Sequence, residues 1–174
     1  RVLFMVDIKK RDLITYFILR KQLEKKNLEV FFCRNGMEIP TVIKHKINII
    51  ILTQLLSKEW IEVAKKLKQL NCIVISLPYE GNPFDAKMKK KNSVGPYKVS
   101  FKAIDHIFTW TKEMAELLKV ENDYIGSPKI TWLGYHRLIP MKKKYKKFRK
   151  NLLQLTNLNI NKKYKIKLLF TSNF

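Results

Sequence analysis

Short, uninterrupted apolar runs that recur along the chain constrain its fold most strongly. The run at residues 2–6, Val-Leu-Phe-Met-Val, shows no alternation between apolar and polar residues. This pattern is typical of a strand that is buried on both faces of a parallel sheet. Such strands are expected at 2–6, 30–33, 47–52, 72–76, 106–109 and 129–133. Helical spacing of apolar residues predicts one helix that Asp12 caps and that ends at residues 25–27, and further helices at 58–70 and 112–119.

This order of strands and helices predicts an α/β protein. We expect a Rossmann-like, mostly parallel sheet with right-handed crossovers and helices on both faces. Ligand sites in such sheets lie beyond the carboxyl ends of the strands. The sequence therefore predicts that residues 7–12, 53–56, 77–84, 110 and 134–137 lie along one rim.

The end of the chain differs in character from what precedes it. Residues 1–140 form the predicted Rossmann-like domain. Residues 141–163 are expected to form a basic helix, at 141–155 with apolar Phe148, Leu152 and Leu155, and then a polar linker. The apolar run at 166–170 is expected to be the first strand of a second domain, at 164–174. On this interpretation the chain is the amino-terminal part of a longer, two-domain protein, and it would be inactive alone.

The charge suggests an anionic partner. Lys and Arg total 36 against 14 Asp and Glu, which gives a net charge of +22. An anionic membrane surface, nucleic acid or a phosphorylated ligand would be attracted, although lysine-rich composition is itself a sufficient explanation. Most of the basic residues are lysines, and neither zinc-finger spacing nor a helix-turn-helix or RNA-binding signature is present, so nucleic acid is the less favoured partner. No apolar run reaches the ~20 residues of a membrane span. We expect a cytoplasmic protein that the lysines attract to the inner face of the membrane.

Several classes of enzyme lack their signatures here. No glycine-rich loop follows the first strand, and no P-loop or G-x-S-x-G motif occurs, which argues against NAD enzymes, NTPases and serine hydrolases. The three histidines lack metal-ligand spacing, so no metal or cofactor is expected. Cys33 and Cys72 lie in apolar runs and are interpreted as core residues of a reduced, intracellular protein.

The first two candidate segments on the predicted rim carry charge. Arg11 and Asp12 place a guanidinium and a carboxylate at the start of a helix, although Asp12 could serve only as a cap. Glu80 and Gly81 lie in a turn, Pro-Tyr-Glu-Gly-Asn-Pro, that follows the fourth strand. A carboxylate there can act as a general base or hold a sugar hydroxyl, and an ordinary turn is an equal alternative.

The other candidates follow the last two strands of the domain. Gly134 permits a sharp turn, and His136 and Arg137 can face phosphate or sugar, although a structural role for His136 is equally compatible. Trp110 is more typical of a core residue or an interdomain contact than of a platform on which a sugar stacks.

These segments, taken in order, resemble a known family. The segments concerned are 11–13, the turn at 77–83, 108–111 with 117–118, 133–139, and 170–174. Together they are similar to motifs of bacterial surface-carbohydrate biosynthesis proteins of GT-B type, which have two Rossmann domains. Those proteins are distant relatives of nucleotide-sugar 2-epimerases and of the CDP-glycerol and Kdo transferases. The chain departs from the family's motifs at Thr111, at Tyr135-His136 and at Ile139.

The resemblance implies a glycosyltransferase that moves a sugar, or a related group, from a nucleotide-activated donor into a surface polysaccharide. In that architecture the carboxyl-terminal domain mainly holds the donor, and the amino-terminal domain holds a saccharide or lipid-linked acceptor. Glu80 would then be the base, and the residues that contact acceptor or phosphate would be Arg11, Asp12, Gly81, Trp110, Gly134, His136 and Arg137. Three alternatives stay open: an epimerase-like enzyme, a basic nucleic-acid-binding module, and a protein that kept the fold without the chemistry.

Overall fold

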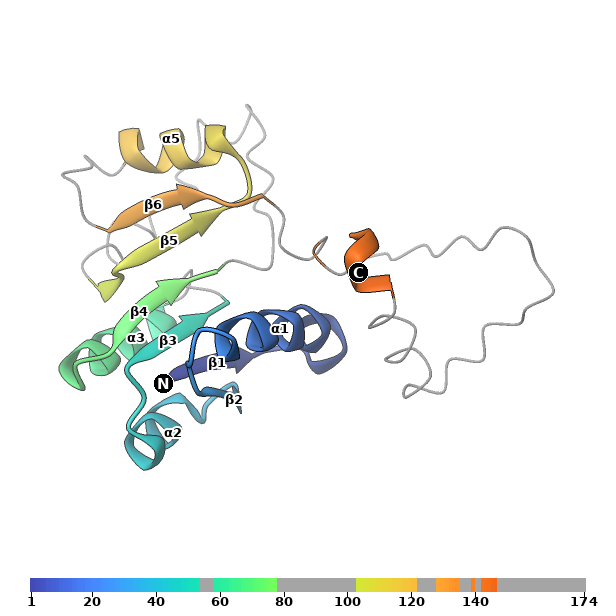
Figure 1. Ribbon diagram of the computed structural model, residues 1–174. Helices are drawn as coiled ribbons and strands as arrows, with labels where there is room; N and C mark the ends of the chain where they lie inside the picture. The colour runs from blue at the N-terminus through green and yellow to red at the C-terminus, as the bar shows by residue number, and fades with distance from the viewer. Residues whose placement is uncertain (54–57, 78–102, 122–127, 135–138, 140–141, 147–174) are drawn as a thin grey trace.

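A computed structural model describes residues 1–53, 58–77, 103–121, 128–134, 139 and 142–146. This part of the chain contains six strands and four α-helices, which alternate except that β5 follows β4, and a short 3-10 helix comes last (Figure 1). The elements are β1 (Val2–Val6), α1 (Lys9–Glu24), β2 (Val30–Arg34), α2 (Glu38–His45), β3 (Ile49–Leu52), α3 (Lys58–Gln69), β4 (Ile73–Ser76), β5 (His106–Thr109), α5 (Lys112–Glu121), β6 (Lys129–Trp132) and η4 (Lys143–Tyr145).

The strands form one sheet in which every neighbouring pair is parallel. Their order across the sheet is β2-β1-β3-β4-β5-β6. All strands therefore end at the same edge, which we call the carboxyl edge (Figure 1). This architecture confirms the predicted α/β, Rossmann-like fold, and the uninterrupted apolar runs are the reason for it, because both faces of the sheet are covered.

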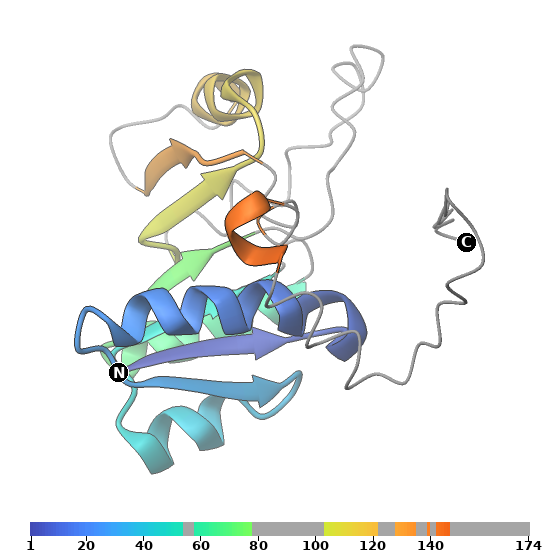
Figure 2. The same cartoon turned by 45° about the vertical axis from the view of Figure 1, so that its right-hand side comes forward.

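Helices lie on both faces of the sheet, as expected. The connection from β1 to β2 moves one way across the sheet, and every later connection moves the other way. Right-handed crossovers therefore place α1 on one face and the other α-helices on the opposite face. We call these the α1 face and the α3 face. Figures 1 and 2 show α1 on the side of the sheet opposite α3 and α5.

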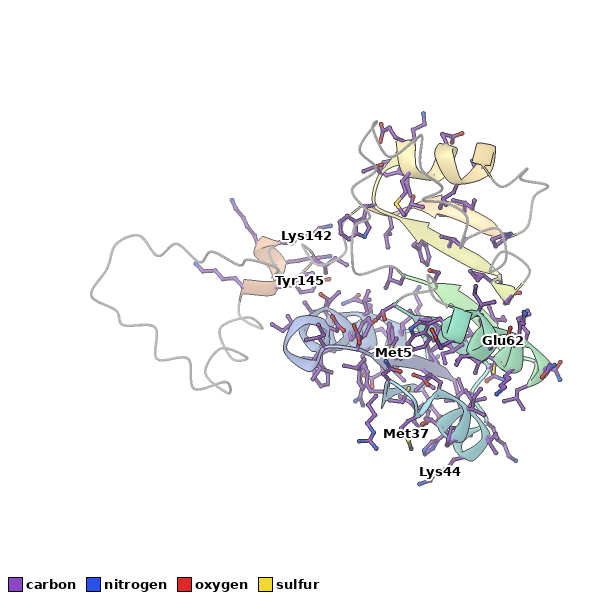
Figure 3. All side chains as sticks on the ribbon, turned by 180° about the vertical axis from the view of Figure 1, so that it is seen from behind. Met5, Met37, Lys44, Glu62, Lys142 and Tyr145 are labelled. Atoms are coloured by element: carbon purple, nitrogen blue, oxygen red, sulfur yellow. The ribbon has the colours of Figure 1, made fainter. Side chains whose placement is uncertain are left out.

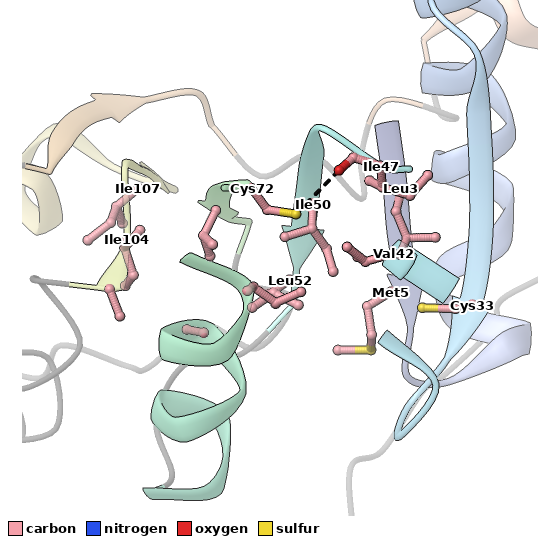
Figure 4. Close-up of a cluster of buried hydrophobic side chains, with 14 of the residues drawn as sticks. Leu3, Met5, Cys33, Val42, Ile47, Ile50, Leu52, Cys72, Ile104 and Ile107 are labelled. Atoms are coloured by element: carbon pink, nitrogen blue, oxygen red, sulfur yellow. Dashed lines mark hydrogen bonds between the residues drawn. The ribbon is translucent and has the colours of Figure 1, made fainter. Parts of the chain in front are cut away.

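Each face has its own hydrophobic core. On the α1 face, Tyr16 packs against Val2 and Phe4 of β1, whose ring centroid lies 4.5 Å from that of Tyr16. On the α3 face, residues of the central strands pack against Val42, Leu67 and Leu118 from three helices (Figure 4). The buried residues of this second core are Leu3, Met5, Cys33, Val42, Ile47, Ile50, Leu52, Ala64, Leu67, Cys72, Val74, Ala103, Ile104, Ile107, Met114 and Leu118.

The expected role of the two cysteines is confirmed in part. Cys33 and Cys72 are both buried in the core of the α3 face and neither forms a disulfide (Figure 4). The Cys72 thiol lies 3.3 Å from the carbonyl oxygen of Ile47, to which it donates. The two residues therefore act as small core side chains, and the redox state of the surroundings stays a prediction.

The structure differs from the sequence-based expectation in one helix and at several element ends. Residues 38–45, which no expected element covered, form α2. Pro40 falls in the first turn of this helix, where a missing N–H costs nothing, so it does not break the helix as a central proline would. Four of the six strands have one end shifted by one or two residues, and the other two have the expected bounds. Of the predicted helix at 141–155 only residues 142–146 are described, and they contain the short 3-10 helix η4. The predicted strand at 166–170 lies outside the described residues.

None of the helices that the structure describes is long and apolar enough to cross a bilayer.

Candidate functional site at the carboxyl edge

The carboxyl edge is divided by a switch in the direction of the connections. The chain leaves β1 toward β2 on one side, whereas it leaves β3 toward β4 on the other. At such a point the two loops diverge and leave a crevice in which parallel α/β proteins bind ligands. Here the switch point falls between Asp7 and Ile8, which follow β1, and Thr53, which follows β3. Thr53 is buried, and its hydroxyl lies 3.9 Å from the Met5 sulfur.

Asp12 holds the turn from β1 into α1. The helix begins at Lys9, three residues before the cap that the sequence predicted, so Asp12 lies within its first turn. Its carboxylate oxygen Oδ2 accepts the backbone N–H groups of Ile8, at 2.9 Å, and of Asp7, at 3.2 Å. The side chain is fully buried. The carboxylate thus occupies amides that the helix cannot pair, and its charge favours a helix start. Contact between Asp12 and a substrate stays a prediction.

The role of Asp12 as an anchor predicts a clear loss of stability on its removal. In Asp12→Ala the two amides lose their shared acceptor, and we expect the free energy of unfolding to fall by about 1–3 kcal/mol. Asp12→Asn keeps one oxygen acceptor and should lose less. Urea unfolding followed by circular dichroism measures both variants. Equal midpoints for the wild type and Asp12→Ala would show that the turn does not depend on this carboxylate.

A buried carboxylate that the sequence analysis did not single out lies after β2. Glu38 opens α2 and is only 2% exposed. Its Oε1 accepts the N–H of Gly36 at 3.0 Å, and Gly36 has a φ of +85°, a conformation that favours glycine. Burial raises the pKa of Glu38, against the lowering effect of the backbone hydrogen bonds that it accepts. Glu38 therefore fixes the turn that leaves β2, at the same edge as Asp12.

Cys33 lies close to Glu38, and burial makes its thiol unreactive as well. Burial, and secondly the negative charge of Glu38, raise the pKa of the Cys33 thiol to about 12. Nucleophilic cysteines need a thiolate, which this pKa excludes near neutral pH. Cys33 is therefore not a candidate nucleophile at the carboxyl edge.

The raised pKa of Glu38 predicts how stability depends on pH. The folded state holds the Glu38 proton more tightly than the unfolded state, whose pKa is the ordinary 4.5, so ionisation opposes folding. This contribution to stability is complete below that ordinary value and is lost as the pH rises through the folded-state pKa. Glu38→Gln keeps an acceptor for Gly36 and removes the titration. We expect the stability of Glu38→Gln relative to the wild type to increase from about pH 4 to pH 8.

Chemical unfolding at several pH values tests this expectation. Glu62→Gln is the matched control, because Glu62 is exposed on α3 and pairs with nearby Lys65 at 2.7 Å. A difference between Glu38→Gln and the wild type that stays constant with pH would contradict the assignment.

The ends of β5 and β6 bring two predicted residues to neighbouring positions. Trp110 directly follows β5 and is half-buried. Gly134 follows β6 by two residues and has a φ of +83°, a conformation that favours glycine, and the turn expected there stays a prediction. The two strands are paired up to Thr109 and Trp132. Trp110 and Gly134 therefore leave the sheet side by side at the carboxyl edge.

Thr111, a departure from the family's motif, has a structural role. Its hydroxyl accepts the N–H of Met114 at 3.1 Å, which caps the start of α5. The Thr109 hydroxyl donates to the Thr111 carbonyl at 2.9 Å. A glycine at this position would provide no such cap, so the threonine fixes the chain on either side of Trp110.

Trp132 is a second feature that the sequence analysis interpreted only as part of a strand. It is the last residue of β6 and is 60% exposed, and Leu133 beside it is 51% exposed. Single exposed apolar residues are common on protein surfaces, but two adjacent large ones form an apolar surface that a ligand or partner can use. The only available signal in the sequence was a tryptophan at the predicted end of a strand.

The predicted site residues separate into three groups. Trp110 and Gly134 come together, whereas Asp12 follows β1, which β3 and β4 separate from β5, at roughly 14 Å across the sheet. Arg11 lies in the first turn of α1, and its side chain is outside the described part of the chain. Glu80, Gly81, His136 and Arg137 are also outside the described residues.

Within the described residues, no group of three or more His, Cys, Asp or Glu side chains could hold a metal ion. Two histidines have packing roles there. The His45 ring lies 4.7 Å from that of Phe31, and the His106 ring stacks on Phe108 and lies 3.0 Å from the Thr131 hydroxyl.

Comparisons of the chain with protein-family models, with curated proteins and with solved structures found no significant match.

Proposed function

We propose that this chain provides the acceptor side of a glycosyltransferase-like enzyme that uses a nucleotide-activated sugar as donor. In this proposal the product belongs to a bacterial surface polysaccharide. The proposal is supported by the order of the motifs along the sequence and by an all-parallel sheet whose loops meet at one edge. Both features suit an enzyme that binds its substrates across a cleft beyond the strand ends.

The observation that carries the proposal is the arrangement at the ends of β5 and β6. Trp110 directly follows β5 and is half-buried, Trp132 ends β6 and is 60% exposed, and Gly134 lies two residues beyond Trp132 with a positive φ. Aromatic rings that present an apolar face beside polar loops suit the alternating apolar and hydroxyl surfaces of a sugar. We therefore place the acceptor saccharide beside these two strands.

The order of the strands favours Glu80 as a neighbour of this aromatic surface. β4 pairs with β5, and Leu77, the residue after β4, donates its N–H to the Leu52 carbonyl at the carboxyl edge. Glu80 follows Leu77 by three residues, a span of at most ~10 Å. Glu80, which follows the end of β4 so closely, would therefore be able to reach an acceptor held at the ends of β5 and β6.

The exposed lysines in and next to η4 suggest a second partner for the proposed enzyme. Lys142, Lys143, Lys144 and Lys146 are all exposed. Figure 3 shows Lys142 and Tyr145 away from the sheet, past its carboxyl edge. We propose that these lysines attract an anionic membrane surface, each by about 1 kcal/mol, and so bring a lipid-linked acceptor to the cleft. We expect raised salt to release the chain from phosphatidylglycerol vesicles. Vesicle binding that does not change with salt concentration would contradict the electrostatic attraction.

Substitution of Trp110 tests the proposed acceptor site. In the natural protein that contains this chain, Trp110→Ala should lower kcat/KM for the acceptor by roughly 10-fold or more, because a stacked ring contributes ~1–3 kcal/mol. Trp110→Phe keeps an aromatic face and should recover most of the loss. The measurement is the initial rate at varied acceptor concentration, with the Km of the donor as a control. Equal losses in the two variants would indicate a packing role instead.

A further inference from the structure

The end of β6 presents two large apolar side chains to solvent. Trp132, the last residue of β6, is 60% exposed, and Leu133, the next residue, is 51% exposed. We call these two residues the apolar tip. The Leu133 N–H donates to the Thr109 carbonyl at 2.9 Å, which continues the pairing of β6 with β5. The backbone of the apolar tip is therefore held by the sheet, at its carboxyl edge.

The two side chains of the apolar tip lie on opposite faces of the sheet. Side chains alternate along a strand, and Ile130, two residues before Trp132, packs in the core of the α3 face. Trp132 therefore lies on the α3 face, and Leu133, which continues the ladder, on the α1 face. A flat protein surface would cover one of them, whereas a fluid lipid interface can surround both. Tryptophan is also enriched where membranes meet water, because its ring is apolar and its N–H is polar.

Exposed lysines lie past the same edge of the sheet as the apolar tip. Lys142 follows Leu133 by nine residues, and it is exposed together with three further lysines of the segment 142–146. Figure 3 shows Lys142 and Tyr145 beyond the carboxyl edge, where β6 ends. A surface that approached the sheet from this edge would therefore meet both the apolar tip and the lysines.

The exposed acidic side chains at the carboxyl edge do not cancel these lysines. Among the described residues they are Asp7, Glu59 and Glu113. Glu59 and Glu113 lie in the first turns of α3 and α5, where the positive end of the helix dipole offsets part of their charge. Arg34 and Lys112 are exposed at the same edge and add to the lysines. The described part of this edge therefore has an excess of positive charge, which suits anionic lipid headgroups.

We propose that the apolar tip inserts into the interface of an anionic bilayer, while the lysines of 142–146 bind its headgroups. Stable attachment of a peripheral protein takes two signals, and salt screens the charge but not the apolar contact. The inference rests on the membrane partner of the proposed function, and it adds the residues that enter the bilayer. In this arrangement the carboxyl edge faces the membrane, as a lipid-linked acceptor at that edge requires.

Quenching of tryptophan fluorescence by brominated lipid tests the insertion directly. The chain has three tryptophans, so the double variant Trp60→Phe, Trp110→Phe keeps only Trp132. Vesicles of phosphatidylglycerol with brominated acyl chains should lower the Trp132 emission several-fold at low salt, relative to vesicles of the same lipid without bromine. Sedimentation of the vesicles measures binding in the same samples. Bound chain without quenching would overturn the insertion and leave the attraction by the lysines intact, whereas a chain that does not bind would overturn both.

A matched pair of substitutions provides the second test, in the full chain with its native tryptophans. Leu133→Ser removes an exposed apolar side chain from the tip. Ile43→Ser removes one that is 62% exposed on α2, which follows β2 at the opposite edge of the sheet. At physiological salt, Leu133→Ser should lower the partition coefficient onto phosphatidylglycerol vesicles about 5-fold or more, and Ile43→Ser should leave it unchanged.

Thermal unfolding checks that both variants fold. Equal partition coefficients for the two variants would contradict insertion at the tip. Self-association that Leu133→Ser abolishes, in a chain that does not bind vesicles, would show instead that a second copy covers the tip. None of these measurements involves sugar transfer, so failure of the transfer assay and failure of the insertion are distinguished.

Discussion

Glu80→Ala is expected to lower the rate of sugar transfer at least about 100-fold with little effect on stability. A positioned general base contributes about 10²–10⁴ to a rate, and a residue in the turn that the sequence predicts should add little to the core. The assay is the initial rate of nucleotide release from the donor by the natural protein that contains this chain. Thermal unfolding checks that the variant folds. Turnover at the wild-type rate would end the assignment of Glu80 as the base.

Glu80→Gln separates the two roles that a carboxylate could play in this turn. The amide cannot remove a proton, but it can still hold a sugar hydroxyl through a hydrogen bond. If Glu80 is the base, Glu80→Gln should be as slow as Glu80→Ala. A glutamine variant that keeps most of its activity would point to a binding role. Glu62→Ala, on the exposed side of α3, is the control that should leave the rate unchanged.

Phe4→Ala has the largest expected effect on stability, a loss of about 3–5 kcal/mol. Phe4 is fully buried on the α1 face, and its ring centroid lies 4.5 Å from that of Tyr16 and 6.0 Å from that of Phe32. Its removal leaves a cavity between α1, β1 and β2. Urea unfolding measures the loss, and it would also show whether α1 closes the core that positions the Asp12 turn.

Ile43→Ala is the matched control for this experiment. Ile43 is a large apolar residue on α2, but it is 62% exposed. Its truncation should change stability by no more than about 0.5 kcal/mol. Similar losses for Phe4→Ala and Ile43→Ala would contradict the assignment of Phe4 to a tightly packed core.

The strands could be predicted from the sequence because each is a compact apolar run. Residues 2–6 and 106–109 are strands with the expected bounds. α2 was missed because Glu38–His45 is short and contains a proline, so its apolar spacing was not distinctive. The predicted start of α1 was too late because aspartate is a residue type that often caps helices, and the prediction placed Asp12 at the cap. The cap geometry depends instead on which amides a carboxylate reaches, and composition does not reveal that.

The predicted site could be tested in the structure only in part. The positive φ of Gly134 agrees with its residue type, because few other residues adopt this conformation. The buried position of Glu38 and the exposure of Trp132 depend on the order in which strands pair, which local patterns do not determine. For the same reason, the sequence predicted a shared rim for Asp12 and Trp110 but not the two strands that lie between them.

The most direct measurement of the central claim is the transfer of a labelled sugar from a nucleotide donor. The natural protein that contains this chain would be incubated with UDP-sugars labelled in the sugar, with labelled CDP-glycerol as an alternative donor, and with a lipid-linked saccharide extract. The account predicts free nucleotide and an equal amount of label in the acceptor, both lost in Glu80→Ala. Label that stays on the nucleotide, as an unchanged or a rearranged sugar, would contradict it.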